Sequence, residues 1–323
     1  MARLRSGWFA AVGAALVLAS SMAMSRAQVT EEPWTGGGLH GTLARPADLV
    51  RGPAVLIVAG SGPTDRDGNG PGPNPFLRTD SYRKLAEGLA ADGILSLRYD
   101  KRGVGESRGL VTREDDVVFD TFISDAVTAL QSLQKRSDVS SVVIAGHSEG
   151  GLIALAASAR VPVAGLVLLT TPGRTYLTLL RAQLKGQLPP DLDASANAIL
   201  DSLAAGKRVE DMPQQLATFF RPSVQPFLMS IGNFDPVAAL AQSKAPALIV
   251  HAGRDLQVSA VDFDMLRAAR SDVQTLELSE ANHTLKKSPA DLQGNRAFYS
   301  NPAAPLDPAL VPTLVAFVRS VAR

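Results

Sequence analysis

The sequence predicts an α/β fold, in which a mostly parallel sheet is covered by helices on both faces. From Ala54 onward, short apolar runs rich in β-branched residues alternate with longer amphipathic stretches. The apolar runs lack the polar alternation of a half-exposed strand, which is typical of strands buried on both faces. Such strands need helices above and below them, and the amphipathic stretches can supply those helices.

The predicted elements follow one another in a regular order. Before the first buried run, 39–47 (LHGTLARPA) predicts an antiparallel edge strand or hairpin. The buried strands are predicted at 54–60, 94–100, 141–146, 163–170, 246–253 and 275–280. The helices are predicted at 81–93, 121–136, 151–160, 261–270 and 308–323.

One segment, 173–235, interrupts this alternation with several helical stretches and no convincing strand. We expect it to be a helical cap inserted into a core made of 28–172 and 236–323, because insertions concentrate in loops. The alternative is that these helices pack on the flank of the sheet. Apolar residues of the segment could line an acyl pocket or form plain helical core: Leu177, Leu180, Phe219, Phe220 and Phe227.

Residues 1–27 are typical of an export signal. Arg3 and Arg5 precede a short apolar run, and small residues then lead to Ser25-Arg26-Ala27, after which we expect cleavage. The run is shorter than the ~20 residues of a spanning helix, which argues against an uncleaved membrane anchor. Cleavage removes three basic residues and no acidic ones, so the formal charge changes from 32 − 31 = +1 to 29 − 31 = −2. We expect an exported protein, periplasmic or secreted.

The composition excludes several classes of function. The 323 residues include no cysteine, so disulfides, thiolate metal sites and a cysteine nucleophile are excluded. No basic stripe or interleaved aromatic pattern indicates nucleic acid, and no later apolar run is long enough to cross a bilayer. We expect a dissolved small molecule as the partner and no integral membrane association after signal cleavage. The oligomeric state is not predicted.

A serine lies at a predicted strand-to-helix turn. Gly146, His147, Ser148, Glu149 and Gly150 form the pattern G-x-S-x-G directly after the strand SVVIAG. Such a sharp turn projects the serine hydroxyl above the sheet edge, and the small flanking residues let the chain bend that tightly. The turn also points the Glu149 N–H at an oxyanion formed beside the serine. We predict Ser148 as a nucleophile; the alternative is a glycine-flanked helix N-cap.

A serine nucleophile needs a histidine base, which in turn needs an acid to orient it. His283 follows the last predicted strand, where a base late in the chain can reach over the sheet edge. His40 lies in the early edge region, and the ring of His147 should point away from the nucleophile. His251 ends a strand, where packing is the usual role. We therefore predict His283 as the base.

Asp255 is the predicted acid, because it lies in a tight turn just past the strand ALIVHAG. A carboxylate at that position can face the loop of the predicted base. Asp262 and Asp264 fall on the next helix and are expected to be solvated. Asp235 precedes Pro236 and fits a helix N-cap with proline at the first helical position.

The stretch 59–76 (AGSGPTDRDGNGPGPNPF) resembles a calcium loop at its start. Asp65, Asp67, Asn69 and Gly70 match its first positions, but Phe76 stands where a bidentate glutamate is needed. A phosphate loop is also disfavoured, because no lysine and hydroxyl residue follow the glycines. Neither ion site is therefore predicted.

The interpretation we favour is an oxyanion hole. The Ser61 N–H would pair with that of Glu149, and Gly60 and Gly62 would let the main chain approach the substrate closely. A merely structural turn is the alternative. The remainder of the stretch is expected to be a rigid excursion, in which the two aspartates brace the loop through Arg66 or Arg102.

Five motifs, AGSGP, RYDKRGVGES, GHSEGG, HAGRDLQV and ANH, together resemble the α/β-hydrolase family in order and spacing over roughly residues 40–322. Ser148, Asp255 and His283 also follow the order expected for this strand and loop arrangement. The resemblance implies no metal or organic cofactor. It also implies a supporting role for RYDKRGVGES, in which Asp100 and Arg102 would pair. Glu106 and Ser107 of this loop are expected to be structural.

GSGPTDRDG together with GHSEGG is similar to bacterial carboxylesterases that act on short acyl esters, and also to relatives regarded as peptidases. We expect an exported serine hydrolase of the carboxylesterase class that forms an acyl-enzyme with a small ester. The alternatives are a serine peptidase or aminoacyl hydrolase on the same site, and a non-catalytic binding protein with this fold. The acyl length, the alcohol and the physiological substrate are not predicted.

Overall fold

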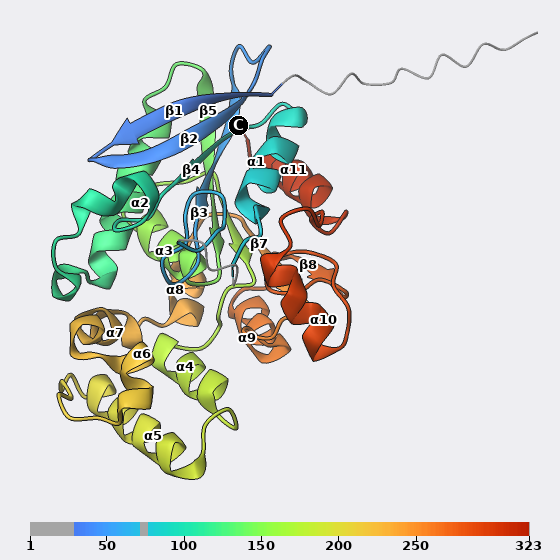
Figure 1. The fold of residues 1–323 in the computed structure, drawn as a ribbon. Helices are drawn as coiled ribbons and strands as arrows, with labels where there is room; N and C mark the ends of the chain where they lie inside the picture. The colour runs from blue at the N-terminus through green and yellow to red at the C-terminus, as the bar shows by residue number, and fades with distance from the viewer. Residues whose placement is uncertain (1–28, 72–76, 323) are drawn as a thin grey trace, which may run out of the picture.

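The computed structural model describes residues 29–71 and 77–322, and these confirm the predicted α/β architecture (Figure 1). Eight strands form one sheet in the order β1-β2-β4-β3-β5-β6-β7-β8. The strands are β1 (Val29–Gly36), β2 (Leu39–Pro46), β3 (Gly52–Val58), β4 (Leu95–Tyr99), β5 (Val139–His147), β6 (Gly165–Leu169), β7 (Ala247–Ala252) and β8 (Gln274–Leu278). The predicted export signal, 1–27, lies outside the described residues.

The first two strands form the antiparallel edge that LHGTLARPA predicts. β1 pairs with β2, and β2 pairs with β4, in antiparallel register. From β4 to β8 every neighbouring pair is parallel. The carboxyl ends of β3, β5, β6, β7 and β8 therefore meet at one edge of the sheet, where loops that carry function are expected.

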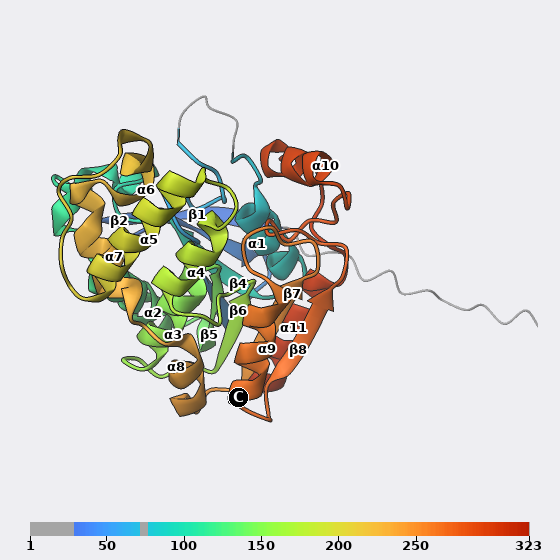
Figure 2. The same ribbon diagram turned by 90° about the horizontal axis from the view of Figure 1, so that it is seen from below.

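Helices cover both faces of the sheet (Figures 1 and 2). The helices α1 (Ser81–Ala91) and α11 (Leu310–Val321) pack on one face, and α2 (Phe119–Gln134), α3 (Glu149–Ser158), α8 (Pro236–Gln242) and α9 (Ala260–Ala269) pack on the other. The strand β3 shows why the strands lack polar alternation. Leu56 and Val58 belong to one apolar cluster while Val55 and Ile57 belong to the other, because successive side chains point to opposite faces.

A helical insert separates β6 from β7 and lies below the sheet in Figure 1. It holds α4 (Tyr176–Leu184), α5 (Pro190–Ala204), α6 (Ala217–Phe220) and α7 (Gln225–Gly232). Leu177 and Phe220 are buried in the insert's own apolar cluster, and Leu180 and Phe227 pack against it. Phe219 is 41% exposed. The pocket that contains Ser148 is lined by none of these five side chains, and the packing of four of them in or against this cluster agrees with the plain-core alternative.

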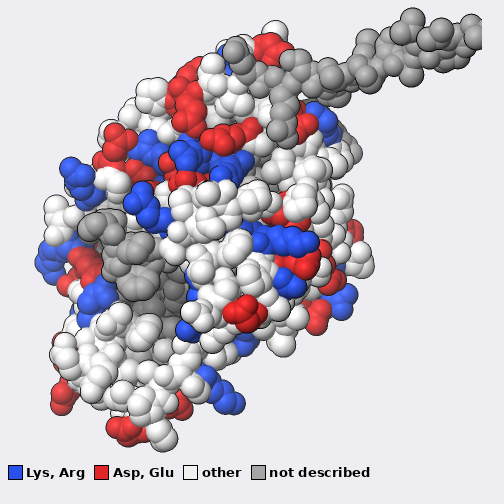
Figure 3. All heavy atoms as spheres, turned by 45° about the vertical axis from the view of Figure 1, so that its right-hand side comes forward, with Lys and Arg blue, Asp and Glu red and all other residues white. Residues whose placement is uncertain are grey.

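Short elements complete the described chain: η1 (Gly105–Leu110), η2 (Glu114–Asp116), η3 (Gln214–Leu216), η4 (Pro222–Val224), α10 (Leu292–Ala297) and η5 (Phe298–Ser300). Asp235 caps α8 as predicted, because its Oδ1 accepts a hydrogen bond from the Ala238 N–H at 3.0 Å. In the described part of the chain, none of the helices is long and apolar enough to cross a bilayer. Figure 3 shows basic and acidic side chains interspersed on one face rather than gathered in stripes of one sign.

Candidate active site

Ser148 lies at the sharp turn between β5 and α3, as the sequence predicts. Its backbone has φ 54° and ψ −123°, a conformation that L-residues rarely adopt. The neighbouring glycines are required by space. A Cβ atom on Gly146 would lie 2.1 Å from the Gly150 carbonyl oxygen, and one on Gly150 would lie 2.3 Å from the Val58 carbonyl oxygen. The turn therefore holds the serine at the carboxyl edge of the sheet.

His283 and Asp255 form a buried pair beside this turn. The distance from His283 Nδ1 to Asp255 Oδ2 is 2.7 Å, and their side chains are 6% and 0% exposed. The other carboxylate oxygen of Asp255 accepts hydrogen bonds from the N–H groups of Gln257 and Val258 at 2.7 and 3.0 Å. The acid is thus held by its own turn, and it orients the imidazole so that Nε2 is left for other chemistry.

Ser148 and His283 line one pocket, together with Ser61 and Gly60. Among the described residues the Ser148 hydroxyl has no hydrogen-bond partner. Bonds between a nucleophile and its base are often long before substrate binds and shorten in the reacting complex. The structure thus brings the predicted nucleophile, base and acid to one site.

Two main-chain N–H groups lie next to the nucleophile. Ser61 follows the end of β3, and a Cβ atom on Gly60 would lie 3.3 Å from Ser148 Cβ, so this segment passes directly beside the serine. Glu149 is the first residue of α3, where the N–H has no intrahelical acceptor. Within the described segments, neither the Ser61 N–H nor the Glu149 N–H has a hydrogen-bond partner. Two unpaired donors at this position fit the predicted oxyanion hole.

Tyr82 and His147 form a hydrogen-bonded chain that the sequence did not predict. The His147 ring is directed to neighbours other than Ser148: its Nε2 lies 2.7 Å from the His283 carbonyl oxygen and its Nδ1 lies 2.8 Å from the Tyr82 hydroxyl. A carbonyl can only accept, so Nε2 carries the proton and Nδ1 accepts from tyrosine. The tyrosine oxygen accepts from the Gly60 N–H at 3.1 Å. The chain therefore joins the oxyanion segment to the loop of the base.

Burial controls the charge of this chain. Burial, followed by the proximity of His283, lowers the pKa of His147 to about 3, so the imidazole is neutral at neutral pH. Burial raises the pKa of Tyr82, which keeps its hydroxyl proton available for His147. No local sequence signal identifies Tyr82, because it lies 65 residues before its histidine partner.

Lys101 and Glu149 form a second buried element that sequence reasoning missed. The lysine is 3% exposed and the glutamate 2%, and Lys101 Nζ lies 2.8 Å from Glu149 Oε1. The same ammonium donates to the Gly60 carbonyl oxygen at 2.9 Å. Lys101 is the second residue after the buried strand β4, and this position was the available signal, since the carboxyl ends of neighbouring parallel strands meet at the site.

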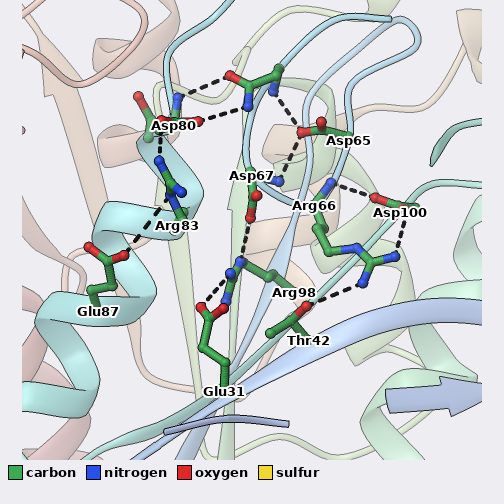
Figure 4. Close-up of polar contacts among 12 residues, drawn as sticks. Glu31, Thr42, Asp65, Arg66, Asp67, Asp80, Arg83, Glu87, Arg98 and Asp100 are labelled. Atoms are coloured by element: carbon green, nitrogen blue, oxygen red, sulfur yellow. Dashed lines mark hydrogen bonds and ion pairs between the residues drawn. The ribbon is translucent and has the colours of Figure 1, made fainter. Parts of the chain in front are cut away.

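The predicted pairing of Asp100 with Arg102 is wrong. Asp100 accepts from the Arg66 guanidinium at 2.7 Å and from the Arg66 N–H at 2.9 Å (Figure 4). Burial disfavours the charged carboxylate, but these hydrogen bonds outweigh burial and lower the pKa of Asp100. Arg102 pairs instead with Asp125 of α2. Glu106 also pairs with Arg66, so its expected structural role is consistent with its contacts.

The predicted bracing of the 61–71 loop also uses other partners. Asp67 pairs with buried Arg98 at 2.8 Å rather than with Arg66 or Arg102 (Figure 4). Asp65 accepts from the N–H groups of Asp67 and Asn69 within its own turn. Because these oxygens are committed, the calcium interpretation gains no support. Asn69 ties the loop to its far end by accepting from the N–H groups of Thr79 and Asp80 at 2.8 and 3.1 Å.

Two further expectations concern side chains near the acid. Asp262 is fully buried and pairs with Arg174 at 2.6 Å, so the expectation that it is solvated is wrong. It faces inward because α9 packs against the sheet at its first turn. Asp264 pairs with Arg267 at the surface, in agreement with solvation. His251 stacks on Phe263 with ring centroids 5.1 Å apart, which is the packing role expected for it.

The loop of His283 is anchored from behind by two side chains. The Ser81 hydroxyl donates to the Thr284 carbonyl at 2.8 Å. Lys286 is fully buried and donates to the carbonyl oxygens of Thr79 and Asn301 at 2.6 and 2.5 Å. Burial lowers the pKa of Lys286 to about 8. These contacts connect the base to the start of α1 and to the C-terminal segment.

Comparison with known proteins places the chain in a family. Residues 78–288 match the family model described as "Serine aminopeptidase, S33". The esterase EstD of Thermotoga maritima is 30% identical over 260 residues, which are 79% of this chain and 60% of that protein. The chain thus spans about three fifths of the length of this curated relative.

Solved structures share the fold at low sequence identity. The Pyrococcus furiosus esterase Pf2001 has a TM-score of 0.53 at 16% identity, covering 92% of this chain and 94% of that chain. Est1E of Butyrivibrio proteoclasticus, solved with ferulic acid bound, has a TM-score of 0.56 at 14% identity, covering 90% and 96%. At these identities the two structures support the fold alone.

Proposed function

The chain belongs to the α/β-hydrolase family, and on that premise we propose that it is a serine esterase that cleaves carboxylic esters with short acyl groups. The observation that carries the proposal is the assembly of three groups at one sheet edge. Ser148 occupies the strained turn, His283 lies in the same pocket, and Asp255 holds the His283 imidazole at 2.7 Å. A serine hydroxyl becomes an effective nucleophile only with such a base.

The reaction follows from these positions. Ser148 Oγ attacks the ester carbonyl carbon while His283 Nε2 takes the hydroxyl proton, and Asp255 stabilises the imidazolium. The N–H groups of Ser61 and Glu149 donate to the oxyanion. His283 then gives its proton to the leaving alcohol as the ester C–O bond breaks. Water, deprotonated by His283, attacks the acyl-enzyme, and the carboxylic acid leaves as Ser148 recovers its proton.

The small size of the pocket supports a short acyl group. The cavity that contains Ser148 and His283 has a volume of about 70 Å³. Thr64, Thr79 and Tyr299 also line it, so polar groups share its wall with apolar ones. An acetyl or propionyl group suits this space better than a long alkyl chain.

The test is hydrolysis of activated aryl esters with acyl chains from acetyl to octanoyl. We expect activity to be highest for the shortest chains and to be lost in Ser148→Ala. A serine-reactive phosphonate should label the wild type and not the variant. Full activity of Ser148→Ala would overturn the assignment of the nucleophile. No labelling and no activity in a folded wild type would favour a non-catalytic binding protein.

A second candidate, a serine aminopeptidase or aminoacyl hydrolase, is favoured by the description of the matching family model. The same nucleophile, base and oxyanion donors would serve amide hydrolysis. Measurement of kcat/KM for aminoacyl anilides beside acyl esters of matched size discriminates the two. We expect the esters to give the higher value.

We also propose that the protein is exported, on the basis of the basic, apolar and small-residue pattern of residues 1–27. Expression of the full chain should yield a shortened protein outside the cytoplasm. Mass spectrometry of its N-terminus would identify the cleavage site. An intact N-terminus in the cytoplasmic fraction would contradict export.

A further inference from the structure

A buried ammonium lies directly behind the proposed oxyanion hole. Lys101 is 3% exposed, and its Nζ contacts the Gly60 carbonyl oxygen and Glu149 Oε1 at 2.9 and 2.8 Å. It also lies 4.6 Å from the centre of the Phe122 ring, a favourable cation–π contact. We propose that Lys101 is a positioning residue that holds both oxyanion donors in place. This inference rests on the proposed function.

The first donor is positioned through its own peptide group. The Gly60 carbonyl and the Ser61 N–H belong to one planar trans peptide, in which C=O and N–H point in opposite directions. When Lys101 fixes the carbonyl end, it fixes the direction of the N–H at the other end. The hydrogen bond also polarises the peptide, because bonds in series strengthen one another at low dielectric. The Ser61 N–H becomes both better aimed and a stronger donor.

The second donor is positioned through the side chain of its own residue. Glu149 supplies the N–H at the start of α3, and its carboxylate pairs with Lys101. One ammonium therefore connects the two segments that carry the donors. The spacing between the end of β3 and the start of α3 is fixed by this pair, as well as by the packing of Gly150 against Val58.

Stability alone does not explain a buried ion pair at this place. Removing two charges from water has a large desolvation cost, so apolar residues of similar volume are often as good or better for folding. This pair contacts the Gly60 carbonyl, and its carboxylate belongs to the residue that supplies the second predicted donor, so it acts where preorganisation matters most. Both donors are main-chain groups, which only a substitution to proline removes, and proline also changes the backbone. Lys101 therefore offers a side chain through which the hole can be tested.

The experiment uses the charge-neutral double variant Lys101→Met with Glu149→Gln, which avoids leaving one buried charge unpaired. The control is Arg136→Met with Asp138→Asn, an ion pair of 2.8 Å at the opposite end of β5 from Ser148. Single-turnover acylation by a short aryl ester gives the acylation rate and the substrate dissociation constant separately. A cooperative thermal unfolding transition is measured for each variant to test whether it is folded.

We expect acylation to slow by about tenfold to a hundredfold in the first variant, below the ~10²–10³-fold cost of removing an oxyanion donor outright. The dissociation constant should change less than about threefold, because the oxyanion forms only in the transition state. Phosphonate labelling should slow in parallel, because attack of Ser148 on the phosphorus also develops negative charge on an oxygen that the same donors would hold, as the leaving group departs. The control should match the wild type in acylation rate, substrate dissociation constant and rate of phosphonate labelling.

A folded first variant with wild-type acylation would overturn the proposal, as would equal losses in acylation and in substrate binding. If that variant does not fold, Lys101→Gln with Glu149→Gln carries the same expectation and the same refutation. Ser148→Ala, measured beside them, separates a failure of the proposed function from a failure of the proposed role of Lys101. If Ser148→Ala loses activity while the Lys101 variants keep full activity, the inference about Lys101 is wrong and the proposed esterase function is supported.

Discussion

The neutral, buried His147 predicts a measurable loss of stability in acid. Its pKa is about 3 in the folded protein, lowered by burial and then by His283, against 6.5 for an exposed histidine. Between pH 3 and pH 6.5 the unfolded chain therefore binds a proton at this residue that the folded chain does not. Stability from this residue is fully present above pH 6.5 and is lost as the pH falls.

The size of the effect at pH 5 follows from the two pKa values. That pH lies about 1.5 units below the pKa of the histidine in the unfolded chain, and each unit corresponds to about 1.4 kcal/mol. Protonation thus stabilises the unfolded chain by roughly 2 kcal/mol. Protonation of His147 stabilises the folded protein by almost nothing at pH 5, because its pKa in the folded state lies well below that pH.

The variant His147→Gln tests this reasoning, because glutamine keeps an N–H for the His283 carbonyl and does not titrate. Free energies of unfolding in urea, followed by Trp34 fluorescence, would be measured at pH 8 and pH 5 for both proteins. We expect the wild type to lose about 2 kcal/mol more than the variant over this interval. His251→Gln, which alters a histidine outside the hydrogen-bonded chain, measures the effect of losing any histidine. Equal losses in wild type and His147→Gln would refute a neutral buried His147.

Two further predictions concern the acid and the turn of the nucleophile. Asp255→Asn should lower kcat on a short aryl ester by about 10⁴-fold with little change in KM, because asparagine no longer holds His283 in the required tautomer; a loss below tenfold in steady-state kinetics would contradict the assigned role. Gly150→Ala places a Cβ atom 2.3 Å from the Val58 carbonyl oxygen, so we expect a loss of about 3 kcal/mol or more in thermal unfolding. Gly109→Ala, where the new atom meets open space, should unfold like the wild type, and equal melting temperatures for the two variants would argue against the clash.

Local sequence was sufficient wherever the deciding forces act within a few residues. Unbroken apolar runs predicted strands buried on both faces, and the two clusters on either side of β3 confirm this. The glycines around Ser148 predicted a tight strand-to-helix turn, and the positive φ of Ser148 agrees with it. Asp235 was identified as a helix cap from its position before Pro236, because capping involves only the first turn of the helix.

Pairings between distant charged side chains could not be predicted in this way. Asp100 and Arg102 are two residues apart, yet Asp100 pairs with Arg66 and Arg102 pairs with Asp125. Only folding brings these partners near. Asp262 was expected at the surface because its helix could be recognised but the rotation of that helix could not. A long side chain can reach several neighbours, and its partner is decided by which elements pack against it.

The sequence by itself determined the fold class and the positions of Ser148, Asp255 and His283. Each of these residues lies in a loop after a predicted strand, and the carboxyl ends of parallel strands meet at one edge of the sheet. Only the tertiary structure decided what surrounds them. The chain from Gly60 through Tyr82 to His147, and the pair of Lys101 with Glu149, join residues 22 to 65 positions apart. Hydrogen bonds and ion pairs depend on distances of a few ångströms in space, and separation along the chain does not set those distances.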